Sequence, residues 1–216
     1  LGQGDRVTRL DLARLDGGIS GGGISGRFAG GSGQIGAVPL LLSEAAGEWR
    51  FARANLALNG ALTVADAAAS ARFRQLMARN VTLRLANGTI SAEGALFEPG
   101  KSVKVADVTL RHVLASGTGA AHLAVSGITF GDGFQPEELT PLTFGVIADV
   151  RGTVRGSGDI AWTPEGVTST GRFATDRADL AAAFGPVAGL KGEVVFTDLL
   201  GLELSLIHIS EPTRQE

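Results

Sequence analysis

Apolar and polar residues alternate along most of the chain, in short runs that end at Gly, Asn, Asp or Pro. In the run Val81-Thr-Leu-Arg-Leu85 every second residue is apolar, and this period of two is typical of a β-strand with one buried face. Asn87-Gly88 follows, a dipeptide that readily adopts the positive φ angles of a type I′ turn. Alternation resumes over residues 89–93, so the pattern predicts a β-hairpin.

The same signature predicts strands over much of the remaining sequence. The expected strands cover 7–15, 48–58, 103–105, 108–113, 121–128, 144–154, 159–162, 167–174 and 192–196. The glycine-rich segment 17–36 fits either a flexible linker or strands with small side chains. The recurrence of apolar residues through it favours strands: Ile19, Ile24, Phe28 and Ile35.

Two helical interruptions are expected. The segment 176–184 begins with Asp, contains good helix formers and stops at Gly185-Pro186, and this pattern predicts a helix. A shorter helical turn is expected at 136–139. The fold predicted from the pattern is therefore all-β and mainly antiparallel, with one or two short helices.

Glycine is unusually frequent, at 32 of 216 residues, whereas cysteine and tyrosine are absent. Each glycine inside a helix costs roughly 1 kcal/mol relative to alanine, so this composition disfavours long helices. Without cysteine the chain has no disulfide, thiolate nucleophile or cysteine-based metal site. The net charge of −3, with no clustering of Lys and Arg, argues against nucleic-acid binding.

Several glycine motifs occur, but none stands in the context that its chemistry needs. The segments 21–26 and 31–36 fit the dinucleotide fingerprint G-x-G-x-x-G, which works only between a strand and a helix. The segment 18–22 fits G-x-S-x-G, whose nucleophile, here Ser20, needs a histidine to accept its proton. His112 and His122 are both expected on strands, with rings that face solvent or the rim of a groove. We predict no catalytic, cofactor or metal site, and these three residues are the best candidates for an unrecognised enzyme.

The two ends of the chain suggest that it is a piece of a longer protein. Residues Leu204 to Arg214 resemble the translation of a transposase adaptor used in sequencing libraries. On this interpretation 204–216 is an artefactual tail, and the alternative is a short amphipathic strand. The chain begins at Leu1 with neither a signal sequence nor an apolar run that could cross a bilayer, so an internal fragment is expected.

The segment 185–202 resembles the YdbH family, in which a short helix precedes a strand that reads G-x-[hydrophobic]-x-F-[TS]-D-L. This pattern is matched by Gly192, Phe196, Thr197, Asp198 and Leu199. The segment 97–184, including Gly158-Asp-Ile-Ala-Trp162, is also similar to the central and C-terminal region of that family. The similarity of residues 1–92 is looser and depends on glycine-spaced strands. We expect one repeating domain over 1–203, of which 93–203 is the more family-like part.

The resemblance implies a lipid-carrying scaffold rather than an enzyme. In this AsmA-like and TamB-like group, strands stack into a long, curved, taco-shaped sheet whose concave face is apolar. The resemblance further implies the periplasm of a diderm bacterium, phospholipid as cargo, an inner-membrane anchor N-terminal to this chain, and an outer-membrane lipoprotein as partner. An older family label is dicarboxylate transport, but the sequence shows no Arg-rich pocket for two carboxylates.

An apolar groove suits a phospholipid, because exposing one ordinary acyl chain to water costs on the order of 10 kcal/mol at roughly 0.8 kcal/mol per CH₂. Alternating strands supply such a surface on one face. The core of an ordinary β-sandwich would show the same local pattern, and a surface β-solenoid of the adhesin type is the alternative function. The expected groove-lining residues are Val81, Leu83, Leu85, Val108, Leu110, Leu123, Val125, Val194 and Phe196.

Overall fold

The computed structural model describes residues 9–20, 22–35 and 38–210, and the side chains of Ser20 and of 205–210 lie outside the description. This part of the chain forms thirteen strands and two single-turn 3-10 helices. The strands are β1 Arg9–Asp11, β2 Arg14–Ser20, β3 Gly23–Gln34, β4 Leu40–Ala52, β5 Asn55–Asp66, β6 Leu76–Ala86, β7 Thr89–Phe97, β8 Lys104–Val113, β9 Thr118–Phe130, β10 Ile147–Trp162, β11 Val167–Ala182, β12 Gly185–Asp198 and β13 Glu203–Ser210. The helices are η1 Pro136–Glu138 and η2 Pro141–Thr143.

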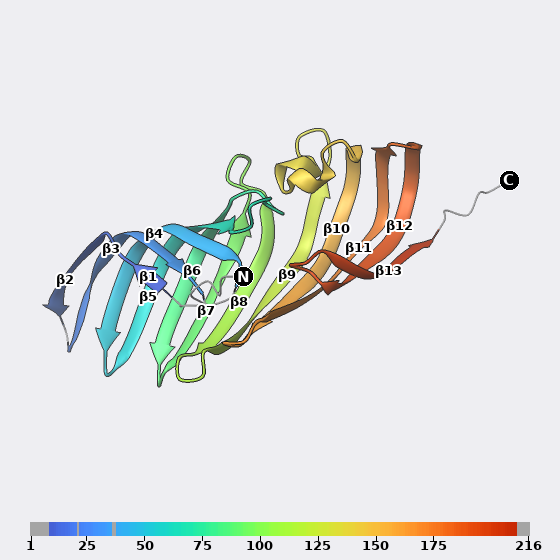
Figure 1. The fold of residues 1–216 in the computed structure, drawn as a ribbon. Coiled ribbons are helices and arrows are strands. Elements are labelled where there is room, and N and C mark those ends of the chain that lie inside the picture. The colour runs from blue at the N-terminus through green and yellow to red at the C-terminus, as the bar shows by residue number, and fades with distance from the viewer. Residues whose placement is uncertain (1–8, 21, 36–37, 211–216) are drawn as a thin grey trace.

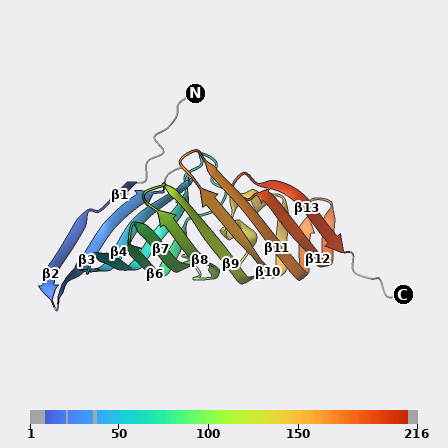
Figure 2. The same cartoon turned by 90° about the horizontal axis from the view of Figure 1, so that it is seen from below.

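All of these strands belong to one antiparallel sheet, in which consecutive strands are neighbours from β3 to β13 (Figure 1). At one end β1 and β2 follow each other along the same edge of β3. Seen from below, the sheet is a curved strip (Figure 2). The described residues contain no second sheet, so the predicted antiparallel all-β fold is confirmed and the sandwich alternative is wrong.

The strands bend where the register between neighbours shifts. An extra residue is accommodated at Glu44 in β4 and at Asn80 in β6, and both adopt positive φ angles, of 54° and 53°. Comparable shifts interrupt the pairing of β3, β10 and β11. Bulges of this kind increase the twist of a strand and bend it, so together they curve the whole sheet.

The curvature brings together segments that lie far apart along the sheet. Val38, in the β3–β4 connection, belongs to the same buried cluster as Ile160 and Trp162 of β10. In a flat sheet β4 and β10 would be about 29 Å apart, from six steps of about 4.8 Å. The face that carries Ile160 is therefore concave. We call it the inner face, and the opposite face the outer face.

Several predicted elements are confirmed. β6 and β7 form the expected hairpin, with Asn87 and Gly88 at φ values of 49° and 70°. The glycine-rich segment forms strands β2 and β3, and the predicted turn at 136–139 contains η1.

Three element predictions are wrong. The segment 7–15, expected as one strand, is divided by Leu12 and Ala13 into β1 and β2. The segment 176–184, expected as a helix, continues β11 to Ala182 and turns back into β12. Hydrogen-bonded pairing with β10 on one side and β12 on the other overrides the local helix propensity. Within this pairing, the side chain of Asp179 accepts a hydrogen bond from the Gly189 N–H at 2.6 Å. The segment 48–58, expected as one strand, is broken by a turn at Arg53 and Ala54, whose φ values are 50° and 60°.

Candidate functional site: the inner face and its cover

The nine residues expected to line a groove all project from the inner face. Cross-strand pairing places Leu83 and Leu110 in one row with Ile160, through alanines on the strands between them. The other residues occupy neighbouring rows of the same face: Val81, Leu85, Val108, Leu123, Val125, Val194 and Phe196. The register thus brings all nine onto one surface, and their contact with lipid stays a prediction.

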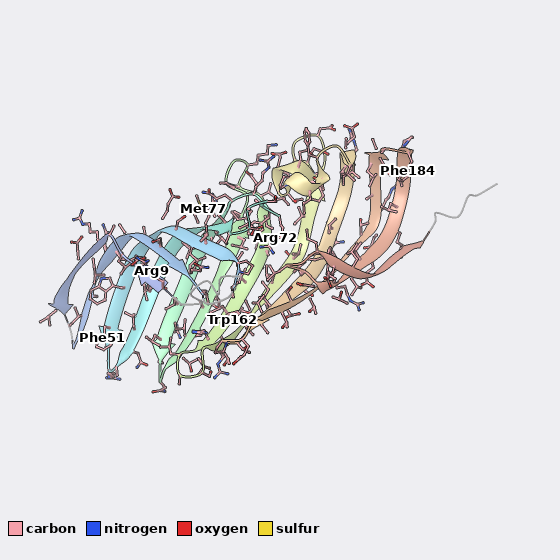
Figure 3. All side chains as sticks on the ribbon, in the orientation of Figure 1. Arg9, Phe51, Arg72, Met77, Trp162 and Phe184 are labelled. Atoms are coloured by element: carbon pink, nitrogen blue, oxygen red, sulfur yellow. The ribbon has the colours of Figure 1, made fainter. Side chains whose placement is uncertain are left out.

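The inner face is exposed near the turn-side rim of β3 and β4 and is covered at β10, although Phe28 of β3, on the same face, is buried. In β3 and β4, the inner-face residues Ile24 and Phe51 are 42% and 45% exposed. In β10, Ile160 and Trp162 are only 6% and 3% exposed. Figure 3 shows Phe51 and Trp162 near the same long rim of the sheet, with Met77 and Phe184 near the other rim.

Two loops cover β10 and β11. Leu199, in the β12–β13 loop, lies over Gly158 and Gly171, and a Cβ atom placed on Gly158 would stand 2.7 Å from Leu199 Cδ2. Because Gly158 has no side chain, Leu199 can occupy this space. Leu200 and Val38 pack against the cluster that contains Ile160, so the cover comes from both the β12–β13 and the β3–β4 connections.

The β12–β13 loop is fixed by a buried serine of the inner face. Ser169 Oγ donates to Asp198 Oδ1 at 2.5 Å and accepts from the Leu200 N–H at 2.8 Å. The Gly201 N–H also donates to Asp198, at 2.9 Å. These donors, the Ser169 hydroxyl first, lower the pKa of Asp198 by stabilising its charged form.

Arg72, in the β5–β6 connection, joins this cover to the other loops. Its guanidinium forms a fork with Asp66, with Nε–Oδ2 and Nη2–Oδ1 distances of 2.7 and 2.5 Å. Nη1 also donates to the Leu200 carbonyl, and Nη2 to the Pro39 carbonyl at 3.5 Å. The Arg72 carbonyl accepts from Thr140 beside the 3-10 helices. One guanidinium therefore links the β3–β4, β5–β6 and β12–β13 connections.

This ion pair is buried, since the side chains of Arg72 and Asp66 are 17% and 0% exposed. The hydrogen bond from Arg72 holds the pKa of Asp66 well below its usual range, in spite of burial, which acts in the opposite direction. We call Asp66, Arg72, Ser169 and Asp198 the clasp. It closes the concave side over β10 and β11.

His112 lies under the cover, on the inner face beside Trp162. It is 4% exposed, which corrects the expectation of a ring facing solvent or the groove rim. Trp162 Nε1 donates to His112 Nδ1 at 3.1 Å. Because an indole N–H can only donate, Nδ1 must carry a lone pair, and the ring is the neutral tautomer protonated at Nε2. The hydrogen bond thus allows a histidine to occupy an apolar surface.

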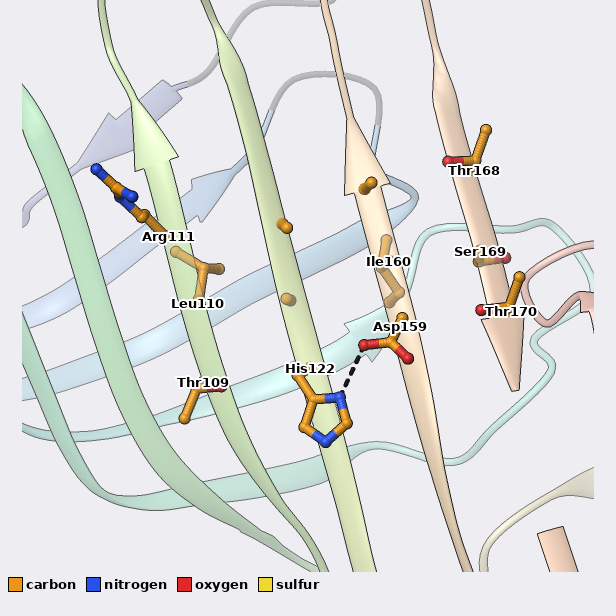
Figure 4. Close-up of a pocket in the computed structure, with 12 residues that line it drawn as sticks. Thr109, Leu110, Arg111, His122, Asp159, Ile160, Thr168, Ser169 and Thr170 are labelled. Atoms are coloured by element: carbon orange, nitrogen blue, oxygen red, sulfur yellow. Dashed lines mark hydrogen bonds and ion pairs between the residues drawn. The ribbon is translucent and has the colours of Figure 1, made fainter. Parts of the chain in front are cut away.

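The outer face carries a shallow depression of about 390 Å³ (Figure 4). His122 Nδ1 and Asp159 Oδ1 lie 2.7 Å apart across it, an exposed pair that sequence reasoning did not predict. Ser169 also borders the depression, but its cross-strand partner is Ile160 and its hydroxyl donates to Asp198 of the clasp. These residues therefore do not form a nucleophile, base and acid in line.

The three residues considered for an enzyme are not brought together. His112 lies on the inner face, whereas His122 is paired with Thr109 on the outer face. Ser20 is a residue of β2, and its side chain lies outside the described part of the chain. In the described residues no three His, Asp or Glu side chains are grouped in a way that could hold a metal ion.

Comparison with known proteins identifies the family. A model of the YdbH-like family, described as intermembrane phospholipid transport protein YdbH, matches residues 2–211. The chain belongs to this family. Neither the curated proteins nor the solved structures gave a significant match. No helix in the described ranges is long and apolar enough to cross a membrane.

The two stretches that carry the resemblance to the YdbH-like family meet in the structure. Gly158 belongs to one and Leu199 to the other, and the glycine leaves room for the leucine. Asp198, next to Leu199, accepts the hydrogen bonds that fix the loop. Residues 203–210 pair with β12 as β13, and the interpretation of 204–216 as an adaptor-encoded tail stays a prediction.

Proposed function

We propose that the inner face of this chain is a segment of an apolar groove that shields phospholipid acyl chains on their way between the inner and outer membranes. Membership of an intermembrane phospholipid transport family supports a lipid cargo. The observation that carries the proposal is the apolar inner face, which Val38, Leu199 and Leu200 cover over β10 and β11 but which is still half exposed at Ile24 and Phe51. A surface of this kind is costly in water unless a ligand covers it.

The proposed mechanism is passive shielding. Each methylene that leaves water for the inner face is stabilised by roughly 0.8 kcal/mol, so a groove several strands long offsets most of the cost of moving an acyl chain. Neighbouring strands are about 4.8 Å apart, and apolar residues recur on the inner face, so an acyl chain that slides along the part of the sheet left open by the cover keeps equivalent contacts. Such transfer needs no catalytic residue, cofactor or nucleotide.

The wider arrangement belongs to the same proposal. In it the chain is a periplasmic part of a bridge that is anchored in the inner membrane through a segment N-terminal to these residues. An outer-membrane lipoprotein meets the other end. The antiparallel sheet supports this arrangement, because the edge strand β2 pairs only with β3 among the described strands and can accept a further strand on its other side.

Native mass spectrometry after expression in a bacterial periplasm tests the proposal. We expect phospholipid to copurify with the chain and to be lost, by tenfold or more, in the Leu83→Lys variant, which places a charge on the inner face. Thr82→Lys is the matched control, since residue 82 is the neighbour of Leu83 on the outer face. A folded, lipid-free parent chain, or equal lipid loss in both variants, would contradict the groove.

A further inference from the structure

Three arginines form a regular row on the outer face. Arg50 of β4 is paired with Ala57 of β5, and Ala57 with Arg84 of β6. On the next strands, Arg84 is paired with Ser91 and Ser91 with Arg111 of β8. Arginine therefore recurs on every second strand, with a small residue between, at a spacing of roughly 10 Å from two steps of about 4.8 Å. We call Arg50, Arg84 and Arg111 the arginine row.

The row follows one long rim of the sheet. Each arginine stands three residues before the residue that begins its turn, at Arg53, Asn87 and Leu114 respectively. Even strands β4, β6 and β8 all end at this rim, so the three positions are equivalent in the meander. The regularity of the row reflects both the strand register and its distance from the turns.

The three arginines are exposed. Among the described residues no ion pair is formed by any of the three, whereas Arg27, Arg155 and Arg172 of the same face lie 4.0 Å or less from a carboxylate. Glu93, diagonal to both Arg84 and Arg111 across Ser91, forms no ion pair with either. The row therefore presents unneutralised positive charge.

The inner face carries an apolar row at the same level. Phe51, Leu56, Leu85 and Ile90 are paired in sequence across β4 to β7. Phe51 and Leu85 each follow an arginine of the row, and Leu56 and Ile90 each adjoin the small residue that lies between two of the arginines. Phe51 is 45% exposed, so this apolar row is open at the rim. A molecule that fits both rows has an apolar body on the inner face and an anionic group at the rim.

We propose that the arginine row binds the phosphates of phospholipid headgroups that protrude over this rim while their acyl chains lie on the inner face. This inference rests on the proposed groove and adds the headgroup chemistry and the side on which it travels. A guanidinium pairs with phosphate through two parallel hydrogen bonds, and its long aliphatic stem lets the charge reach past the edge of an apolar surface. Repetition of the arginine lets a phosphate pass from one site to the next.

Two short-chain lipids that share their tails test the row. Dioctanoyl phosphatidate and dioctanoylglycerol differ only in the phosphate, and their affinities for the full chain are measured by titration calorimetry. We expect Arg50→Gln/Arg84→Gln/Arg111→Gln to weaken phosphatidate binding by about fivefold to tenfold and to leave diacylglycerol binding unchanged. The parent's preference for phosphatidate should also shrink as salt is raised.

The matched control is Arg27→Gln/Arg155→Gln/Arg172→Gln. It removes an equal number of positive charges from the outer face but leaves the arginine row intact. We expect it to bind phosphatidate as the parent does. Equal phosphatidate binding by the row variant and the parent would overturn the inference, as would equal weakening for both lipids. Polyglutamate is titrated against the same variants as an acidic polymer without acyl chains. If the row variant loses polyglutamate binding and keeps lipid binding, the row binds acidic polymers and the inference is overturned as well. Absence of binding of either lipid to the parent would instead refute the proposed groove.

Discussion

Replacing Arg72 by methionine tests whether the clasp holds the cover over β10 and β11. Methionine retains apolar bulk but removes the donors to Asp66, Pro39 and Leu200. The Asp66 side chain is 0% exposed, so its carboxylate would be left buried without a cation. Removal of one partner from a buried ion pair costs about 3–5 kcal/mol.

The cost is expected to fall on the loops rather than on the sheet, because Arg72 lies in the β5–β6 connection and takes no part in the strand ladders. A change of 3–5 kcal/mol raises the ratio of open to closed cover by roughly 10² to several times 10³. Trp162, 3% exposed under the cover, reports on this opening. The chain has two tryptophans, so Trp49→Phe makes Trp162 the sole emitter. In that background we expect acrylamide to quench Trp162 much more strongly in Arg72→Met than in the parent.

Two further variants show whether the buried charge is the cause. Asp66→Asn/Arg72→Met removes the unpaired carboxylate, and we expect it to restore part of the protection of Trp162. Arg172→Met breaks the 3.0 Å pair with Glu193, in which Arg172 is 65% exposed, so it should cost less than about 1 kcal/mol and leave Trp162 protected. Unchanged quenching of Trp162 in Arg72→Met would refute the role of the clasp.

Acid should open the cover, because the folded pKa of Asp66 lies below its value in the unfolded chain. Its stabilisation is then complete above about pH 4 and is lost progressively at lower pH, so quenching of Trp162 should rise on acidification, and less steeply in Asp66→Asn. A Cβ on Gly119 would lie 2.3 Å from Trp162 Cζ2, so Gly119→Ala should displace the indole and cost about 1–3 kcal/mol in urea unfolding. Leu199→Ala removes the side chain that lies over Gly158 and should cost about 2 kcal/mol in the same measurement.

The strands and their faces were accessible from the sequence because both follow from a local period of two. The hairpin at Asn87-Gly88 needs only its own residues, and once Val81, Leu83 and Leu85 are assigned to one side, their common face follows. The sequence pattern could not distinguish a single curved sheet from a sandwich. That difference depends on the bulges at Glu44 and Asn80, which are residues without a distinctive signal for a register shift.

The cover and the clasp could not be predicted, because they join residues that are distant in the chain. Arg72 and Leu200 are 128 positions apart, and neither stands in a motif that indicates the other. The burial of His112 was missed for a related reason, since it depends on Trp162 donating a hydrogen bond from another strand. Asp198 could have drawn attention, because it belongs to the stretch that resembles the family. Its role as the acceptor for Ser169 required the register of β11.

The central claim is that acyl chains lie on the inner face, and Trp49 tests it most directly. It shares a cross-strand row with Leu58 and Leu83 in the half of the inner face that the cover leaves open. In Trp162→Phe, a phospholipid with brominated acyl chains should quench Trp49. A tryptophan placed on the outer face by Thr82→Trp, in a chain that lacks both natural tryptophans, should keep its emission. No quenching of Trp49, or equal quenching on both faces, would contradict the account.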